Sequence, residues 1–160
     1  MPSRPVKWCP NHRERFLFVV LRCGIWLIGF GYLWMEAREV VATRQITNLA
    51  VFALLFALAS YQQSTSRWFF AIRRKDVALT CAHASNWMFL ASLMAVGDAA
   101  QDVFIASLVS AGSYASLLPV LFAIGWVCNL FAVLLALWSM EIYLPVVFTN
   151  LAIKQIPSDE

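Results

Sequence analysis

The stretch Leu117–Trp138 (LLPVLFAIGWVCNLFAVLLALW) decides the fold, because it holds no charged residue over a length that crosses a membrane. A helix needs about 20 mostly apolar residues to cross the hydrocarbon layer. Helix is the expected conformation, since unpaired backbone groups are costly in lipid. Asn129 is the one carboxamide inside the stretch. The sequence therefore predicts a transmembrane helix here.

The composition of the whole chain agrees with that prediction. Of its 160 residues, 61% are hydrophobic and 13% are charged, and the mean hydropathy is +0.70. Ordinary soluble domains are about half apolar and about a quarter charged. A soluble fold of this length could not bury so much apolar surface. We therefore expect an all-α integral membrane protein.

Three further stretches are apolar enough to be spans, at residues 16–34, 46–61 and 77–97. With 117–138 they predict a four-span antiparallel transmembrane helix bundle over residues 16–138. A basic N-terminal segment, 1–15, precedes the bundle, and a cytoplasmic or interfacial segment, 139–160, follows it.

Two segments leave alternatives open. Residues 103–111 (VFIASLVSA) are apolar but too short to cross a membrane, so they extend a neighbouring span or lie at the interface. After Trp138, Glu141 and Pro145 disfavour continued spanning, and we predict a helix that leaves the membrane and lies along its surface. For 139–153, extension of the last span is the alternative.

Basic residues predict the orientation, because cytoplasmic loops carry an excess of Lys and Arg. They cluster before the first span and in the 62–76 loop, whereas the loop after the third span has none. Both termini should therefore be cytoplasmic. Arg73, Arg74 and Lys75 are interpreted first as an orientation signal and second as a contact for lipid headgroups. The expected location is a bacterial inner membrane, with a mitochondrial membrane as the alternative.

Signals of catalysis and of cofactor binding are missing from the sequence. It contains no G-x-S-x-G, H-E-x-x-H, P-loop or C-x-x-C pattern. Cys9 and His12 are spaced like half a zinc site, but His83 is the one further histidine, so neither a zinc site nor bis-histidine haem is expected. Asp98 and Asp102 are interpreted as a solvated helix end. All four cysteines should be free thiols, and we expect no enzyme and no cofactor.

Four polar side chains are candidates for one layer inside the membrane: Arg22, His83, Asn86 and Asn129. Counting about 1.5 Å per residue from the cytoplasmic ends of the spans puts Arg22 and His83 about 9 Å deep, and Asn86 and Asn129 about 13 Å deep. Such groups usually face the interior of a bundle. The preferred interpretation is that they hold the helices together. Glu141, at the cytoplasmic boundary, could reach Arg22 or Arg73, which would make a structural pair rather than a proton pathway.

The expected function is binding rather than catalysis. Small residues spaced four apart, as in Ala91–Ala95 and Ala132–Ala136, favour close helix packing. We predict a small polytopic membrane protein that contacts another integral membrane protein, as an accessory subunit or an immunity or exclusion protein. The alternatives are an oligomeric pore-forming or holin-like protein and, third, a membrane enzyme using His83. The expected partners are the lipid bilayer and another membrane protein or a second copy, and no nucleic acid.

Overall fold

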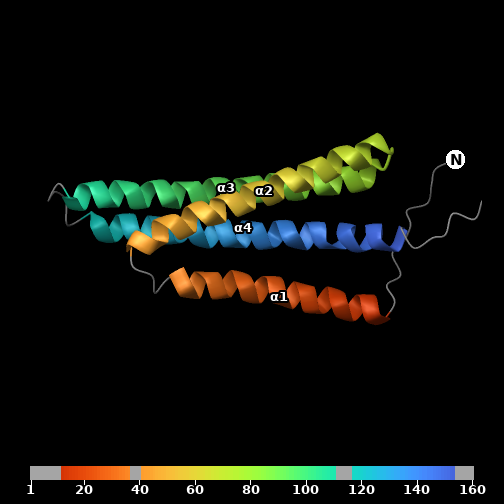
Figure 1. The fold of residues 1–160 in the computed structure, drawn as a ribbon, viewed down its shortest axis with the longest axis horizontal. Helices are drawn as coiled ribbons and strands as arrows, with labels where there is room; N and C mark the ends of the chain where they lie inside the picture. The colour runs from red at the N-terminus through yellow and green to blue at the C-terminus, as the bar shows by residue number, and fades with distance from the viewer. Residues whose placement is uncertain (1–11, 37–40, 111–116, 154–160) are drawn as a thin grey trace, which may run out of the picture.

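The computed structural model describes residues 12–36, 41–110 and 117–153, and these form four α-helices (Figure 1). Their bounds are α1 His12–Glu36, α2 Val41–Ala71, α3 Lys75–Ser110 and α4 Leu118–Ile153. The predicted all-α class is confirmed. Helices α2, α3 and α4 pack together, and α1 lies along the opposite side of α4 (Figure 1).

Three of the described helices are long and apolar enough to cross a membrane, at Arg15–Met35, Lys75–Ser110 and Leu118–Phe148. They support a membrane location for the protein. Helix α2, which contains the predicted second span, is not among them: its side chains are described from Asn48 on, and over that part the polar run Ser60–Arg67 (SYQQSTSR) lowers the mean hydropathy.

The loop predicted at 62–76 is much shorter in the structure, because α2 continues to Ala71 and α3 begins at Lys75. Polar residues of this region are accommodated in a helix by their hydrogen bonds. Thr65 Oγ1 donates to the carbonyl of Tyr61 within α2, and Ser66 Oγ donates to the carbonyl of Ala78 on α3. Arg73, with φ of 61°, makes the reversal that ends α2.

The segment after Trp138 is not a separate helix, because α4 runs without a break through Pro145 to Ile153. A membrane helix tolerates proline where neighbouring helices pack around it. Tyr143, Leu144, Val146 and Phe148 are buried on either side of the proline, and this packing keeps the segment in the bundle. Residues 103–110 are likewise the last part of α3 rather than a separate helix.

Small side chains form the centre of the three-helix unit. Ala59 of α2, Ala91 and Ala95 of α3 and Ala132 of α4 are buried together around Met88. Alanines at these positions let the helices approach closely, which is the main source of packing energy in lipid. Two of the predicted small-residue pairs therefore contribute to the bundle interior.

Helix α1 is held to α4 along one edge. The ring of Phe18 packs on that of Phe148, with centroids 5.6 Å apart, near one end of α1. In the middle, a Cβ atom at Gly29 would lie 3.1 Å from both terminal methyl carbons of Leu137. Gly29 thus sets the distance between the two helices.

We predict that Gly29→Leu separates α1 from α4, because overpacking a close contact costs about 1–3 kcal/mol. The measurement is the yield of a bifunctional thiol cross-link between Phe18→Cys and Phe148→Cys, in a chain without the native cysteines. Gly31→Leu is the matched control, since a Cβ there meets nothing within 4 Å. Equal loss of cross-linking in both variants would contradict the prediction.

Candidate functional site

The four side chains predicted to share one polar layer do not meet in the structure. Arg22 is bound to Glu141, and the Nε2 atom of exposed His83 accepts a hydrogen bond from Trp87, 3.0 Å away on the same helix. Asn86 is exposed between α2 and α3. Buried Asn129 lies 3.4 Å from the hydroxyl of Tyr32 on α1. The prediction that these four side chains form one layer is therefore wrong.

The register of α3 and α4 explains the difference. Ser139 Oγ donates to the carbonyl of Ala84 at 2.7 Å, so these two residues lie at the same height. Ten residues along antiparallel α4, Asn129 is level with about residue 94 of α3, roughly 12 Å beyond Asn86. Depths counted from the ends of apolar runs assumed that all spans start in one plane. The helices are staggered instead.

A different polar network joins all four helices. It consists of Tyr32 of α1, Asn48 of α2, Asp98 and Asp102 of α3, and Asn129 of α4. Tyr32 donates its hydroxyl to Asn48 Oδ1 at 2.9 Å, and Asn48 Nδ2 donates to Asp98 Oδ2 at 2.7 Å and to Asp102 Oδ2 at 3.2 Å. Asn129 Nδ2 donates to the Tyr32 hydroxyl oxygen at 3.4 Å. Of these five residues, the sequence prediction had singled out Asn129 for such a layer.

The two aspartates are buried, which overturns their interpretation as a solvated helix end. Each exposes 1% of its surface, and both lie inside α3, which continues to Ser110. Their spacing of four residues puts the carboxylates on one helix face. The single amide of Asn48 then reaches both. Buried polar groups of this kind specify one packing arrangement when their hydrogen bonds are made.

Gly125 allows this network to fit against α4. A Cβ atom at that position would lie 2.6 Å from Asp98 Oδ1 and 3.3 Å from Gln101 Nε2. The Gln101 nitrogen is buried without a hydrogen-bond partner among the described residues. The edge of the network toward α4 is thus packed against bare backbone.

A second polar contact holds α1 to α4 nearer the basic end of the molecule. Glu141 Oε1 accepts from both Arg22 Nε and Trp26 Nε1, each at 2.7 Å. Of the two arginines considered as partners of Glu141, Arg22 is the one that it contacts in the structure. Since the side chains of Arg22 and Glu141 are 54% and 19% exposed, this is a contact at the edge of the bundle.

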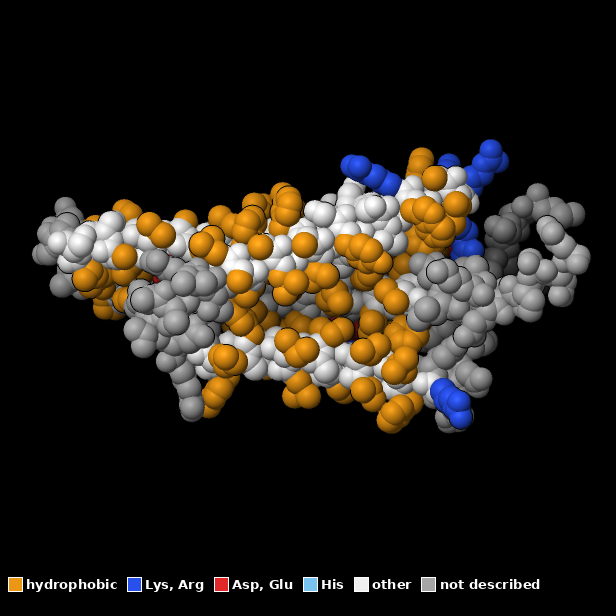
Figure 2. All heavy atoms as spheres, viewed as in Figure 1, with side chains coloured by type: hydrophobic (Ala, Val, Ile, Leu, Met, Phe, Trp, Pro, Cys, Tyr) orange, Lys and Arg blue, Asp and Glu red, His pale blue; other side chains and the backbone are white. Residues whose placement is uncertain are grey.

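Between these two contacts lies an apolar cleft, which we call the α1–α2 cleft. Its volume is about 280 Å³, and it is lined by apolar atoms of α1, α2 and α4 together with Met88 of α3. Ala132 and Ala136 of α4 belong to the floor. Ile28 and Leu54 stand at its rim with 74% and 59% of their surfaces exposed, so the cleft opens outward (Figure 2).

The remaining residues singled out in the sequence are the possible metal ligands, the cysteines and the basic residues of the α2–α3 turn. No three His, Cys, Asp or Glu side chains in the described part of the chain are grouped to hold a metal ion, and Cys23, Cys81 and Cys128 are free thiols. Cys9 lies outside the described residues. Arg73 lies in the turn between α2 and α3, with Arg74 and Lys75 next to it.

Comparison with known proteins adds no relative. The chain matches no protein-family profile, no curated protein and no solved structure. Any function must therefore be argued from the residues themselves.

We predict that Asn48→Leu destabilises the bundle by about 1–3 kcal/mol, because it removes a donor that serves two buried carboxylates. The measurement is reversible unfolding in mixed detergent micelles. Asn86→Leu is the matched control: the same substitution at an exposed site should change the unfolding free energy by less than about 0.5 kcal/mol. Equal effects would show that the network does not hold the helices.

Proposed function

We propose that this protein acts without catalysis, by binding a transmembrane helix of another integral membrane protein. The observation that carries the proposal is the α1–α2 cleft. It is lined by apolar atoms alone, opens to the outside and has alanines on its floor. Large side chains of an incoming helix can pack closely on such a floor.

Close packing is what distinguishes a partner helix from lipid. Acyl chains are as apolar as leucine, so apolar surface alone gives membrane helices no reason to associate. Surfaces with small residues between large ones do associate, because the fit adds dispersion contacts. Leu54 and Ile28 at the rim and Ala132 and Ala136 below them form a surface of that kind.

The position of α1 also supports the proposal. The apolar window of α1 has none of its residues buried inside the protein, whereas 44% of the α3 window is buried. Helix α1 therefore stands beside the bundle, attached by Glu141 and the polar network. A partner helix that entered the cleft would cover the exposed inner face of α1.

The proposal includes four spans with both termini in the cytoplasm. Asn48 contacts Asp98, and Ser66 contacts Ala78, so α2 runs beside α3 for 18 residues between these points, about 27 Å. That length supports α2 as a crossing helix shielded by α3. The basic residues of α1 and of the α2–α3 turn lie at one end of the molecule (Figure 2), which supports a cytoplasmic position for that end. The inner membrane of a bacterium remains the proposed location.

This threading predicts the results of reporter fusions. A fusion at Glu160 should report the cytoplasm, and fusions at Glu39 and Gly112 should report the opposite side. A fusion at Glu160 that reported the opposite side would mean that one helix, most simply α2, does not cross the membrane.

The partner is tested by a photo-reactive amino acid at Leu54, on the rim of the cleft, in cells that naturally make the protein. We expect a cross-link to one integral membrane protein. The same group at Leu93, which is also exposed but does not line the cleft, should not give it. Ala136→Phe, which fills the floor, should abolish the Leu54 cross-link while the protein still inserts.

Other outcomes would contradict the proposal in different ways. Cross-links to lipid alone from both positions would make the cleft an ordinary lipid-facing surface. Cross-links to a second copy alone, together with ion flux through liposomes, would favour an oligomeric pore.

A further inference from the structure

A polar groove lies on another side of the molecule, between α2 and α3, and its character differs from that of the α1–α2 cleft. We call it the α2–α3 groove. Its volume is about 420 Å³. Four of its lining residues, Ser60, Gln63, Ser64 and Arg67, are spaced 3, 4 and 7 apart from the first, so they share one face of α2. Asn86 faces them from α3.

Several of these side chains have hydrogen-bonding capacity to spare. Ser60 donates to the carbonyl of Phe56, so its donor is used. Among the described residues, the side chains of Gln63, Ser64, Arg67 and Asn86 make no hydrogen bond or ion pair within the protein. Arg67, Ser64 and Asn86 are exposed on the outer surface of the bundle. In a membrane such groups are costly unless something from outside binds them.

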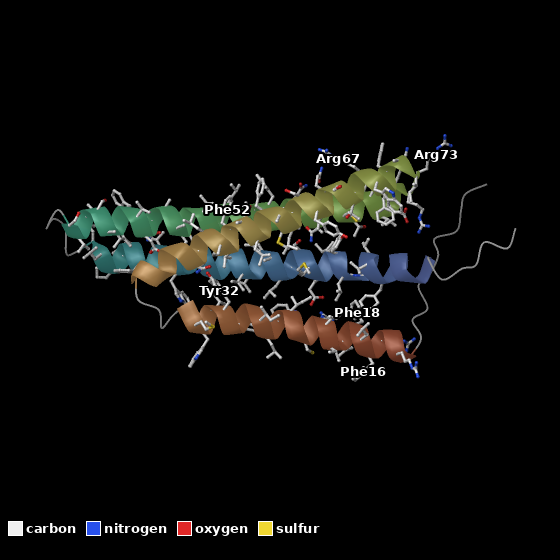
Figure 3. The ribbon with its side chains drawn as sticks, in the orientation of Figure 1. Phe16, Phe18, Tyr32, Phe52, Arg67 and Arg73 are labelled. Carbon is white, nitrogen blue, oxygen red and sulfur yellow. The ribbon has the colours of Figure 1, made fainter. Side chains whose placement is uncertain are left out.

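The groove changes from charged to apolar along its length. Arg67 is at the basic end, four residues before the end of α2 (Figure 3). About 16 Å further along α2, the groove ends on Phe56 and Phe89, whose ring centroids are 6.0 Å apart. The described residues that line it include no Asp or Glu, so its formal charge is positive.

We propose that the α2–α3 groove binds one anionic phospholipid. Arg67 and the Ser64 hydroxyl donate to the phosphate, an arrangement in which charge-assisted hydrogen bonds are strong. The amides of Gln63 and Asn86 donate to the ester carbonyls, and one acyl chain lies on Phe56 and Phe89. The groove thus follows the polarity of a lipid in the order phosphate, ester and chain.

A partner helix fits the groove less well. An acidic residue on such a helix would pair with Arg67. The amides of Gln63 and Asn86, a turn or more away, would then need further polar residues on the same helix. Each of those residues is costly to place in lipid. The lipid proposal does not depend on the partner proposed for the α1–α2 cleft, because the linings of the two sites share no residue.

The test is native mass spectrometry of the full chain in mild detergent, with phosphatidylglycerol and phosphatidylcholine of identical acyl chains. We expect one phosphatidylglycerol to bind about tenfold more tightly than phosphatidylcholine. Arg67→Gln should remove about tenfold of that affinity, as the loss of one charge-assisted hydrogen bond does. Arg15→Gln makes the same charge change on exposed α1 and should leave the affinity within about twofold.

Further variants and ligands decide between the remaining occupants. Asn86→Leu, which keeps the charge, should weaken phosphatidylglycerol binding without changing the melting temperature of the lipid-free protein. Equal affinity for the two lipids, or equal losses in Arg67→Gln and Arg15→Gln, would overturn the proposal. So would glycerol phosphate binding as tightly as the whole lipid, since it has no acyl chain, or a photo-reactive group at Ser64 that captured protein instead of lipid.

Discussion

The hydrogen bonds from Asn48 to Asp98 and Asp102 are the contact on which the arrangement of the helices depends. An apolar interface in lipid tolerates sliding, because neighbouring apolar positions differ little in energy. Two buried carboxylates that share one amide donor do not tolerate it, since a shift by one turn would leave polar groups unmatched in a dry interior. This contact fixes the height of α2 against α3, and Ser139 fixes α4 against both.

Helix α1 is attached to the other helices in a different way. Its contacts with the other helices include two polar points, Glu141 and the Tyr32 hydroxyl, with Gly29 as a close approach between them. The space left between α1 and α2 is therefore not a packing fault. It results from a helix attached at intervals to a bundle whose interior is already filled by Met88 and the surrounding alanines. A unit with a closed core and one partly attached helix leaves this surface open to the partner helix proposed above.

The sequence predicted the helical class and the membrane location, because these depend on composition and on the length of apolar runs. It named Arg22 only as one of two arginines that Glu141 could reach. It did not predict the polar network. Asp98 and Asp102 follow a glycine at the end of an apolar run and look like solvated loop residues, and Asn48 stands at the start of a short span. The available signal was the spacing of the aspartates, which gives both carboxylates one helix face. Helix register could not be read from the sequence, since it is set by contacts between residues far apart in the chain, such as Ser139 with Ala84.

The turn of three residues between α2 and α3 has a consequence for how the protein is made. Helix α2 alone would present Asn48, Gln62 and Ser66 to lipid, whereas in the folded protein all three are buried against its neighbours. A helix with that many exposed polar groups partitions poorly from the translocation machinery into the bilayer. Joined to apolar α3 by so short a turn, it can enter as one half of a hairpin whose polar groups already face each other. On the proposed four-span threading, biosynthesis delivers three units to the membrane, α1, the α2–α3 hairpin and α4, rather than four independent helices.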